Sequence, residues 1–151
     1  MPIAPKKITA FTFFKLPAAY WLGIRVKTIT KEKCIVSVKH RWINQNPFKS
    51  LFWAVQGMAA ELSTGALVMS AIKDSDQRIS MLVAKNKASF LKKATGRITF
   101  TCLDGLIIQE AIDNAIESGE GCTCWVKSEG VDKQGVIVSV FEFEWTLKVK
   151  S

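Results

Sequence analysis

The segment from Asn44 to Ile72 is predominantly apolar and carries a single carboxylate, Glu61, near its middle. At 3.6 residues per turn, its apolar side chains cover nearly every side of a helix. Such a helix has to be covered nearly all round by other elements. A buried charge costs free energy unless a partner or a function holds it. The fold therefore needs a layer that wraps this helix, and Glu61 needs a reason to lie in it.

Strand-like alternation of polar and apolar residues occupies much of the remaining chain. Strands are predicted over 24–30, 34–40, 78–91, 96–103, 122–130 and 136–150, and a shorter helix over 106–118. The inward-facing side chains predicted for the last strand are Phe141, Phe143, Trp145, Leu147 and Val149. The strands 78–91 and 96–103 are expected to be antiparallel neighbours, joined through 92–96.

The long helix is expected to begin at Asn46 and Pro47, with asparagine as the N-cap and proline at the first helical position. The order of elements predicts an α+β protein in which a curled antiparallel sheet wraps around a long central helix, with an additional shorter helix. The sequence contains no internal repeat and no linker, so residues 1–151 are expected to form one domain.

The net charge of +8 favours an anionic partner: nucleic acid, anionic lipid or a small molecule that bears phosphate. The alternative is a basic surface that only keeps the protein in solution. Nucleic acid is disfavoured, because Phe90 is the one aromatic residue within the lysine-rich run 85–97 and stacking platforms need several exposed rings.

The four cysteines, Cys34, Cys102, Cys122 and Cys124, lie in apolar, strand-like contexts, and His40 is the single histidine. This pattern predicts no disulfide, no metal site and no cofactor, and it excludes a Ser-His-Asp triad unless His40 is the base.

The apolar N-terminal segment 8–23 is interrupted by Lys15 and Pro17, and no run reaches the roughly 20 apolar residues that a membrane span needs. It also lacks the cleavage pattern of a signal peptide. The sequence therefore predicts a cytoplasmic protein without a membrane span.

On the predicted helix, Ala54, Gly57, Glu61 and Thr64 fall on one narrow side. Small residues beside a lone carboxylate leave room for a ligand to approach, whereas a solvated face usually carries several charges. The free amides at the start of the helix suit an anion or a developing oxyanion. The alternative is that Glu61 pairs with a lysine or arginine at a subunit interface.

The segment RWINQNPFKSLFWAVQGMAAELSTGALV (41–68) resembles the centre of hot-dog-fold acyl-CoA thioesterases. It is most similar to a DUF4442-like branch of small proteins related to the phenylacetyl-CoA thioesterase group. In that group an asparagine-containing loop precedes a His-Gly-Gly at the helix start, and an acidic residue follows. Here the asparagine falls on Asn46 and the acidic residue on Glu61, whereas Phe52, Trp53 and Ala54 replace the His-Gly-Gly.

The resemblance implies that Glu61 acts as general base or nucleophile on a thioester, with backbone amides near Trp53 and Ala54 binding the oxyanion. Asn46 and Gln56 would orient the water or the carbonyl; the alternatives are helix capping for Asn46 and interface packing for Gln56. Some members also use a Ser or Thr on the following strand, for which Ser80 is the nearest hydroxyl here.

The implied substrate is acyl-CoA or an acyl-carrier thioester, bound at the interface of a homodimer or a dimer of dimers. The cations expected to meet the phosphates of CoA are Lys85, Lys87, Lys92, Lys93 and Arg97. Their alternative role is protection of an edge strand. The N-terminal aromatic residues would cover an acyl tunnel or pack in the core. The alternative function is an acyl-CoA or fatty-acyl binding protein that performs no catalysis.

Overall fold

The structure, a computed structural model, describes residues 3–151. Its elements in chain order are α1 (Pro5–Lys15), α2 (Pro17–Trp21), β1 (Arg25–Ile29), β2 (Cys34–Lys39), a 3-10 turn (Trp42–Asn44), α3 (Trp53–Asp74), β3 (Ile79–Phe90), β4 (Arg97–Cys102), α4 (Gly105–Ser118), β5 (Cys122–Val131) and β6 (Ile137–Val149).

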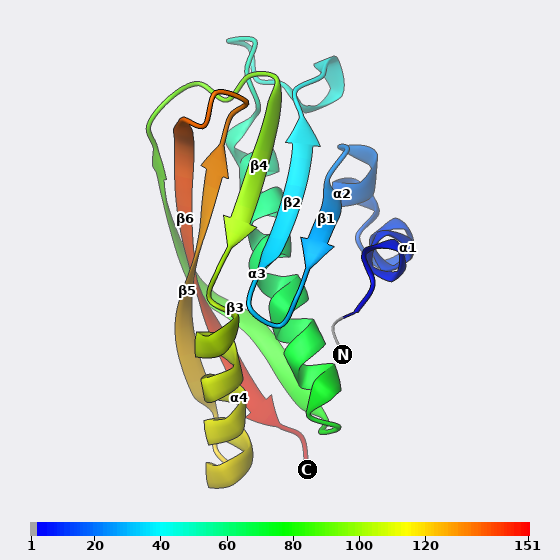
Figure 1. Cartoon of the computed structure of the whole chain (residues 1–151), viewed down its shortest axis with the longest axis vertical. Coiled ribbons are helices and arrows are strands. Elements are labelled where there is room, and N and C mark those ends of the chain that lie inside the picture. The colour runs from blue at the N-terminus through cyan, green and yellow to red at the C-terminus, as the bar shows by residue number, and fades with distance from the viewer. Residues whose placement is uncertain (1–2) are drawn as a thin grey trace.

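The six strands form one antiparallel sheet in the order β1-β2-β4-β5-β6-β3. The sheet curls around α3, which packs against β2, β4 and β5, and α4 extends below the sheet (Figure 1). The expected α+β class, the curled antiparallel sheet, the long central helix and the shorter helix are confirmed.

Strand β6 alternates as its sequence predicts. Phe141, Phe143, Trp145 and Leu147 are buried beneath α3 and α4, while Val149 at the end of the strand is partly buried. The regular alternation directs four large apolar side chains to one face, so β6 supplies a large share of the surface that covers the central helix.

The expected pairing of the strands after α3 is wrong. β3 pairs with β6 at the edge of the sheet, and β4 lies between β2 and β5. The link 91–96 crosses the end of the sheet, because Leu91 and Lys92 donate backbone hydrogen bonds to Val138 while Gly96 accepts one from His40. Pairing with β6 gives hydrogen-bond partners to the backbone along nearly the whole length of β3. A hairpin with β4, which has 6 residues against the 12 of β3, would leave part of β3 unpaired.

The expected start of the long helix is also wrong, because α3 begins at Trp53, with Phe52 in the N-cap position. The side chain of Asn46 closes a loop instead: its Oδ1 accepts hydrogen bonds from the amides of Phe48 (2.9 Å) and Ser50 (3.3 Å). An asparagine side chain that bonds its own following residues competes with helix formation.

Two N-terminal helices lie beside β1, where the sequence indicated only an apolar segment (Figure 1). Each begins with proline at its first position, Pro5 in α1 and Pro17 in α2, where a missing amide hydrogen costs nothing. Ile8, Thr12 and Ala19 are buried and attach the pair to the rest of the protein. No helix among residues 3–151 is long and apolar enough to cross a membrane.

Candidate functional site

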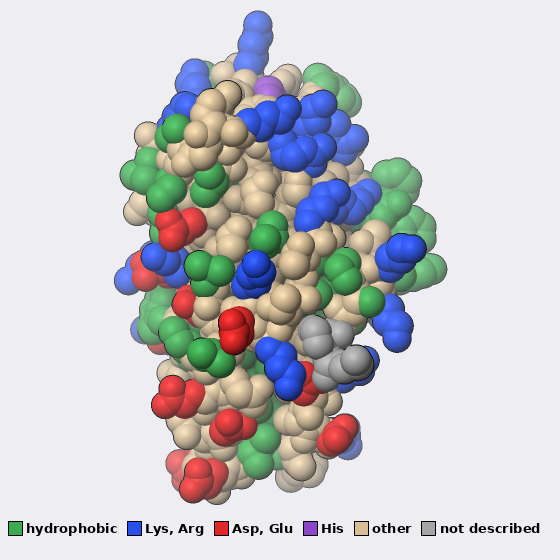
Figure 2. Space-filling model, in the orientation of Figure 1, with side chains coloured by type: hydrophobic (Ala, Val, Ile, Leu, Met, Phe, Trp, Pro, Cys, Tyr) green, Lys and Arg blue, Asp and Glu red, His purple; other side chains and the backbone are tan. Residues whose placement is uncertain are grey.

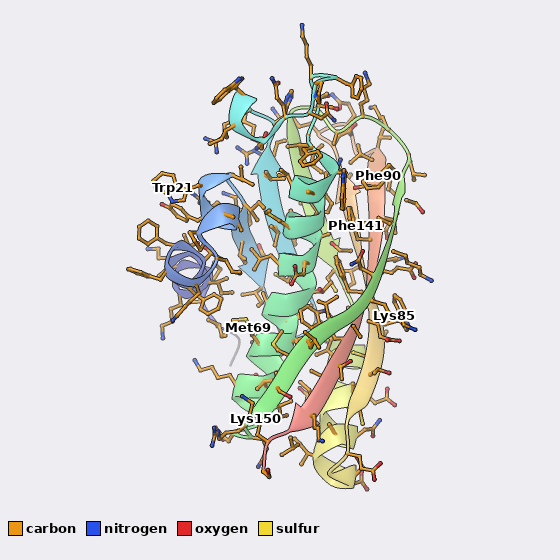
Figure 3. All side chains as sticks on the ribbon, turned by 180° about the vertical axis from the view of Figure 1, so that it is seen from behind. Trp21, Met69, Lys85, Phe90, Phe141 and Lys150 are labelled. Atoms are coloured by element: carbon orange, nitrogen blue, oxygen red, sulfur yellow. The ribbon has the colours of Figure 1, made fainter. Side chains whose placement is uncertain are left out.

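Glu61 lies midway along α3, at the border of a cavity of about 330 Å³, the Glu61 cavity. The residues that line this cavity are Lys15, Leu16, Pro17, Ala18, Ala19, Met58, Glu61, Leu62, Gly65, Met69, Met81 and Trp145. In Figure 3 the labelled Met69 marks the lower part of α3, between the N-terminal helices and β3. The walls are almost entirely apolar, and Glu61 is the one acidic residue among them.

The Glu61 carboxylate is chemically conspicuous. Within residues 3–151 no hydrogen bond or ion pair reaches it, although Lys15 borders the same cavity. The side chain is open to solvent on one side, yet the protein around it removes enough water to raise its pKa above the usual 4.5. A carboxylate of raised pKa is a stronger base than an ordinary surface glutamate.

Of the small residues on α3, Gly65 borders the Glu61 cavity, whereas Ala54, Gly57 and Thr64, which were expected beside Glu61, do not line it. A Cβ added to Gly65 would lie 3.3 Å from Trp145 Cζ2, and one added to Gly57 would lie 3.5 Å from Phe141 Cε1. Thr64, which was expected on the same side, is buried, and its hydroxyl accepts a hydrogen bond from Trp145 Nε1. Thr64 therefore fixes the floor of the cavity rather than facing the ligand space.

A second cavity of about 560 Å³, the helix-start cavity, lies where the loop 45–52 and the link 91–96 meet the beginning of α3. The residues that line it are Asn46, Pro47, Phe48, Ser50, Leu51, Phe52, Trp53, Gln56, Phe90, Leu91, Lys92, Lys93 and Ala94. Five of the residues predicted for the site, Asn46, Trp53, Gln56, Lys92 and Lys93, are thus brought together, but Glu61 is not among them.

Two kinds of polar group in this region lack partners. Gln56 is 5% exposed, and its Oε1 accepts no hydrogen bond from residues 3–151. The amides of Trp53 and Ala54, the first two of the helix, likewise find no acceptor within the described part of the chain. Because Gln56 and Trp53 line the helix-start cavity, a buried acceptor and a free helix amide lie at one end of a cavity that is otherwise largely apolar, whereas Ala54 is not among its lining residues.

The side-chain amide of Asn46 is already engaged within its own loop. Its Nδ2 donates to Ser50 Oγ (2.9 Å) and to the Leu51 carbonyl (3.3 Å). Asn46 therefore shapes the wall of the helix-start cavity.

Four of the five predicted cations have local partners among residues 3–151, and Lys87 pairs with Glu142 at 3.5 Å. Lys92 pairs with Asp132 at 2.8 Å, Lys93 Nζ lies 5.9 Å from the Phe48 ring centroid, and Arg97 donates to Ser37 Oγ at 2.7 Å. Figure 2 shows Lys and Arg side chains gathered at the upper end of the molecule and Asp and Glu at the opposite end, where α4 lies. Residues 98–126 contain five carboxylates and no Lys or Arg.

Five other predicted residues, Ala54, Ser80, Lys85, Lys87 and Arg97, lie outside both cavities. Ser80 is exposed and donates to the Lys148 carbonyl (3.2 Å), because its neighbour Met81 takes the inward-facing position on β3. His40 binds Gln45 through Nε2 at 3.2 Å, away from both cavities, and residues 3–151 hold no cluster of three metal-ligating side chains.

The two cavities are separated along the same helix. Glu61 follows Ala54 by about two turns, so at 1.5 Å per residue the carboxylate lies roughly 10 Å along the axis from the free amides. A single carbonyl group does not reach both within one chain.

Sequence reasoning missed most of the Glu61 cavity. The alternation of β6 indicated that Trp145 points inward, but no local signal linked it to Glu61. The wall formed by 15–19 was hidden, because the segment was not recognised as helical.

The family model described as "Domain of unknown function (DUF4442)" matches residues 5–148. Among solved structures, PA5026 of Pseudomonas aeruginosa, a protein of unknown function described as a probable thioesterase, is 21% identical, with a TM-score of 0.82 over 99% of each chain. Thioesterase HI1161 of Haemophilus influenzae is 11% identical, with a TM-score of 0.74 over 99% of this chain and 93% of that one. A mutant of thioesterase PA1618 of Pseudomonas aeruginosa is 16% identical, with a TM-score of 0.74 over 99% and 97%. No curated protein matches the chain.

These identities are low, so the likeness to solved structures establishes the fold alone, which is the thioesterase-like hot-dog fold expected from the sequence. With a family model that matches nearly its whole length, the chain belongs to the DUF4442 family.

Proposed function

We propose that the chain, acting as one domain over residues 1–151, hydrolyses an acyl thioester with Glu61 as its general base or nucleophile. The observation that carries the proposal is the Glu61 carboxylate, which has a raised pKa and no partner within the described residues, at the border of an apolar cavity. The thioesterase descriptions of the structural neighbours agree with it.

The chemistry needs one proton acceptor and one oxyanion site. Acting as a base, Glu61 takes a proton from water while the oxygen attacks the thioester carbonyl; the carbon–sulfur bond then breaks, and the departing thiolate recovers the proton. Acting as a nucleophile, the carboxylate attacks the carbonyl carbon and expels the thiolate, which leaves a mixed anhydride; water then hydrolyses the anhydride, restores the Glu61 carboxylate and supplies the proton that the thiolate takes up. Free backbone amides stabilise the oxyanion in either route, and here Trp53 and Ala54 supply them.

We further propose that the site is completed by a second copy of the chain. Because Glu61 lies roughly 10 Å from the amides of its own helix, the base and the oxyanion site come from different subunits. β3 is an edge strand of 12 residues whose one partner strand among residues 3–151 is β6, so its outer edge is open to a copy of itself. A twofold axis there runs the two α3 helices in opposite directions and brings the start of one alongside Glu61 of the other.

The basic end of the molecule suits the phosphates of CoA or of a phosphopantetheine carrier arm. Lys92 and Lys93 border the helix-start cavity, and Arg97 lies on the next strand. The apolar Glu61 cavity suits the acyl chain. Asn46 contributes by holding the loop, and Gln56 Oε1 accepts a hydrogen bond from the attacking water or the carrier arm. We assign Ser80 no direct contact with the substrate.

The second candidate function is acyl-CoA or fatty-acyl binding without hydrolysis. The observation that favours it is the helix start, where Phe52, Trp53 and Ala54 occupy positions that hold His-Gly-Gly in the related thioesterases. Bulky side chains there narrow the approach to the free amides.

The test is hydrolysis of short, long and aromatic acyl-CoAs by the wild type and by Glu61→Gln, with release of free thiol as the readout. Glu61→Gln keeps the size of the side chain and removes the base. Turnover by the wild type that falls at least about a hundredfold in Glu61→Gln supports catalysis, in line with the usual effect of a lost general base. Acyl-CoA binding by both proteins, without turnover by either, supports the binding function instead.

A further inference from the structure

We propose that α1 and α2 form a docking surface for a lipid bilayer that carries anionic headgroups. The apolar side chains exposed on this surface, the aromatic surface, are Phe11, Phe13, Phe14, Leu16 and Trp21. Phe14 is 76% exposed and Trp21 is 63% exposed, which is unusual for rings of this size. In Figure 2 hydrophobic side chains project at the right edge, where α1 and α2 lie in Figure 1, with Lys and Arg around them.

The rings are held in place by contacts with one another and with the Arg25 side chain. Phe13 meets both Phe14 and Tyr20 edge-on, with centroids 4.9 Å apart in each pair, and Tyr20 meets Trp21 at 5.6 Å. The Arg25 guanidinium stacks on the Tyr20 ring, with Cζ 4.0 Å from the ring centroid. The fold thus presents these rings to the outside as an ordered group, which suits insertion into the boundary between headgroups and acyl chains.

The charged side chains that α1, α2 and β1 themselves carry have one sign, while the Glu61 carboxylate of α3 borders the cavity beneath residues 15–19. The cations within residues 1–31 are Lys6, Lys7, Lys15, Arg25, Lys27 and Lys31, and the first carboxylate of the chain is Glu32. Lys6, Lys7 and Lys15 are exposed and form no salt bridge within the part of the chain that the structure describes. An anionic surface complements such a patch, whereas a second copy of the same surface would bring like charges together.

Pairing of two β3 strands is compatible with an exposed Trp21. Figure 3 shows Trp21 at one edge of the molecule and Lys85 of β3 at the opposite edge. The stretch 15–19, which joins α1 to α2, also forms one wall of the Glu61 cavity. An acyl chain leaving the bilayer would therefore reach the cavity directly; that link rests on the proposed function, while the docking itself does not.

A second group of exposed rings provides a matched control. Trp42, in the 3-10 turn Trp42–Asn44, is 82% exposed, and Phe48, which lines the same cavity as Lys92 and Lys93, is 70% exposed. They are of the same two residue types as Phe14 and Trp21 but lie elsewhere on the molecule, Phe48 at the border of the helix-start cavity. Docking through the N-terminal helices depends on the first pair and not on the second.

The experiment is co-sedimentation of the full chain with vesicles of phosphatidylcholine, alone or with about one-third phosphatidylglycerol. We expect binding to the anionic vesicles that weakens in high salt and in the triple variant Lys6→Gln, Lys7→Gln, Lys15→Gln. Phe14→Ala combined with Trp21→Ala should lower the partition coefficient at least about tenfold, because two large apolar side chains no longer insert. Trp42→Ala combined with Phe48→Ala should leave the coefficient within about twofold of the wild type.

Brominated lipid adds a readout that does not depend on the folding of the double variant. Bromine quenches tryptophan at bilayer depth, so quenching in the wild type should fall in Trp21→Phe, which keeps an apolar ring in place. The proposal is overturned if the wild type does not bind anionic vesicles, or if only the Trp42 and Phe48 substitutions abolish the binding. It is overturned as well if Trp21→Phe leaves the quenching unchanged. It is also overturned if the Phe14 and Trp21 substitutions change the oligomeric state and leave vesicle binding intact. Vesicle binding needs no turnover, so its failure is distinguishable from failure of thioester hydrolysis.

Discussion

Trp145 Nε1 donates a 3.0 Å hydrogen bond to Thr64 Oγ1, and this contact ties the last strand of the sheet to the central helix. The Thr64 hydroxyl in turn donates to the Glu61 carbonyl at 2.9 Å. Both side chains of the Trp145–Thr64 pair are buried, and the indole forms part of the cavity that Glu61 borders. One hydroxyl thus links the backbone at the candidate base to the floor of the candidate acyl site.

Thr64→Val should destabilise the fold by about 1–3 kcal/mol, because it leaves the buried Trp145 N–H without an acceptor while preserving the side-chain volume. Urea unfolding followed by tryptophan fluorescence measures the change. Thr64→Ser keeps the hydroxyl and removes only a methyl group, so it should lower the free energy of unfolding by less. Equal losses in the two variants would mean that packing, not the hydrogen bond, holds the pair together.

The raised pKa of Glu61 predicts opposite effects of pH on stability and on activity. Because folding raises the pKa, the folded protein holds this proton more tightly than the unfolded chain does. The resulting stability is complete below the unfolded-state pKa and is lost as pH rises through the folded-state pKa. Glu61→Gln should therefore be more stable than the wild type at pH 7 and should lose this advantage near pH 4. Activity should follow the deprotonated form and rise with pH above 4.5.

Denaturant titrations at several pH values test the predicted change in stability, and the acid limb of the kcat/KM profile tests the predicted change in activity. A Glu61→Gln protein whose stability relative to the wild type does not change with pH would contradict the raised pKa. An acid limb centred at the ordinary pKa of glutamate would contradict it as well.

Two glycines of α3 should respond differently to the same substitution. A Cβ at Gly57 meets Phe141 at an ordinary contact distance of 3.5 Å, so Gly57→Ala should stabilise the helix by about 0.5–1 kcal/mol. A Cβ at Gly65 would lie 3.3 Å from Trp145 Cζ2 and protrude beside the Glu61 cavity. Gly65→Ala should therefore stabilise the helix less than Gly57→Ala does, and it should weaken binding of long acyl chains. Thermal unfolding and KM for a series of chain lengths separate the two. Identical behaviour of both variants would remove Gly65 from the acyl site.

The cysteines should divide into an inert group and a reactive one. Burial raises the pKa of Cys34 and Cys102 to about 12 and that of Cys124 to about 11, so all three remain protonated thiols at pH 8. Cys122 is only partly buried. Alkylation of the native protein with iodoacetamide, followed by peptide mass spectrometry, should label Cys122 first and the others only after unfolding. Early labelling of Cys34 would contradict the buried pairing of β2 with β4.

Local pattern predicted the elements of the sheet but not how they pair. The alternation in β6 and the apolar run of α3 were sufficient, because each follows from side chains that face one layer. The neighbours of β3 depend on contacts between Leu91 and Val138, which are far apart in the sequence and leave no local signal. Asn46 followed by Pro47 is an equally good start for a helix and for a closed loop. The closed loop forms because the amides of Leu51 and Phe52 donate hydrogen bonds to the carbonyls of Ala94 and Asn44.

The candidate site divides in the same way. Glu61 was recognisable because a lone carboxylate in an apolar helix is conspicuous in any sequence. The cavity beside it was not, since its walls come from α1, α2, β3 and β6, which approach only in the folded chain. The predicted cations are near one end of the molecule, but their partners Asp132, Phe48 and Ser37 emerged only from the structure.

The most direct test of the central claim, that Glu61 of one subunit works with the helix start of another, is a subunit-mixing experiment. Glu61→Gln removes the base, and Trp53→Pro removes a helix amide at a position where the extended Phe52 backbone accepts proline. Trp53→Ala, which keeps the amide, controls for the lost indole. Each variant is assayed alone for acyl-CoA hydrolysis, and the two are then refolded together.

Each variant alone should be nearly inactive, and an equal mixture should recover about a quarter of wild-type activity, since half of the dimers are mixed and each mixed dimer has one complete site of two. No recovery in a mixture that forms mixed dimers would contradict a site shared between subunits.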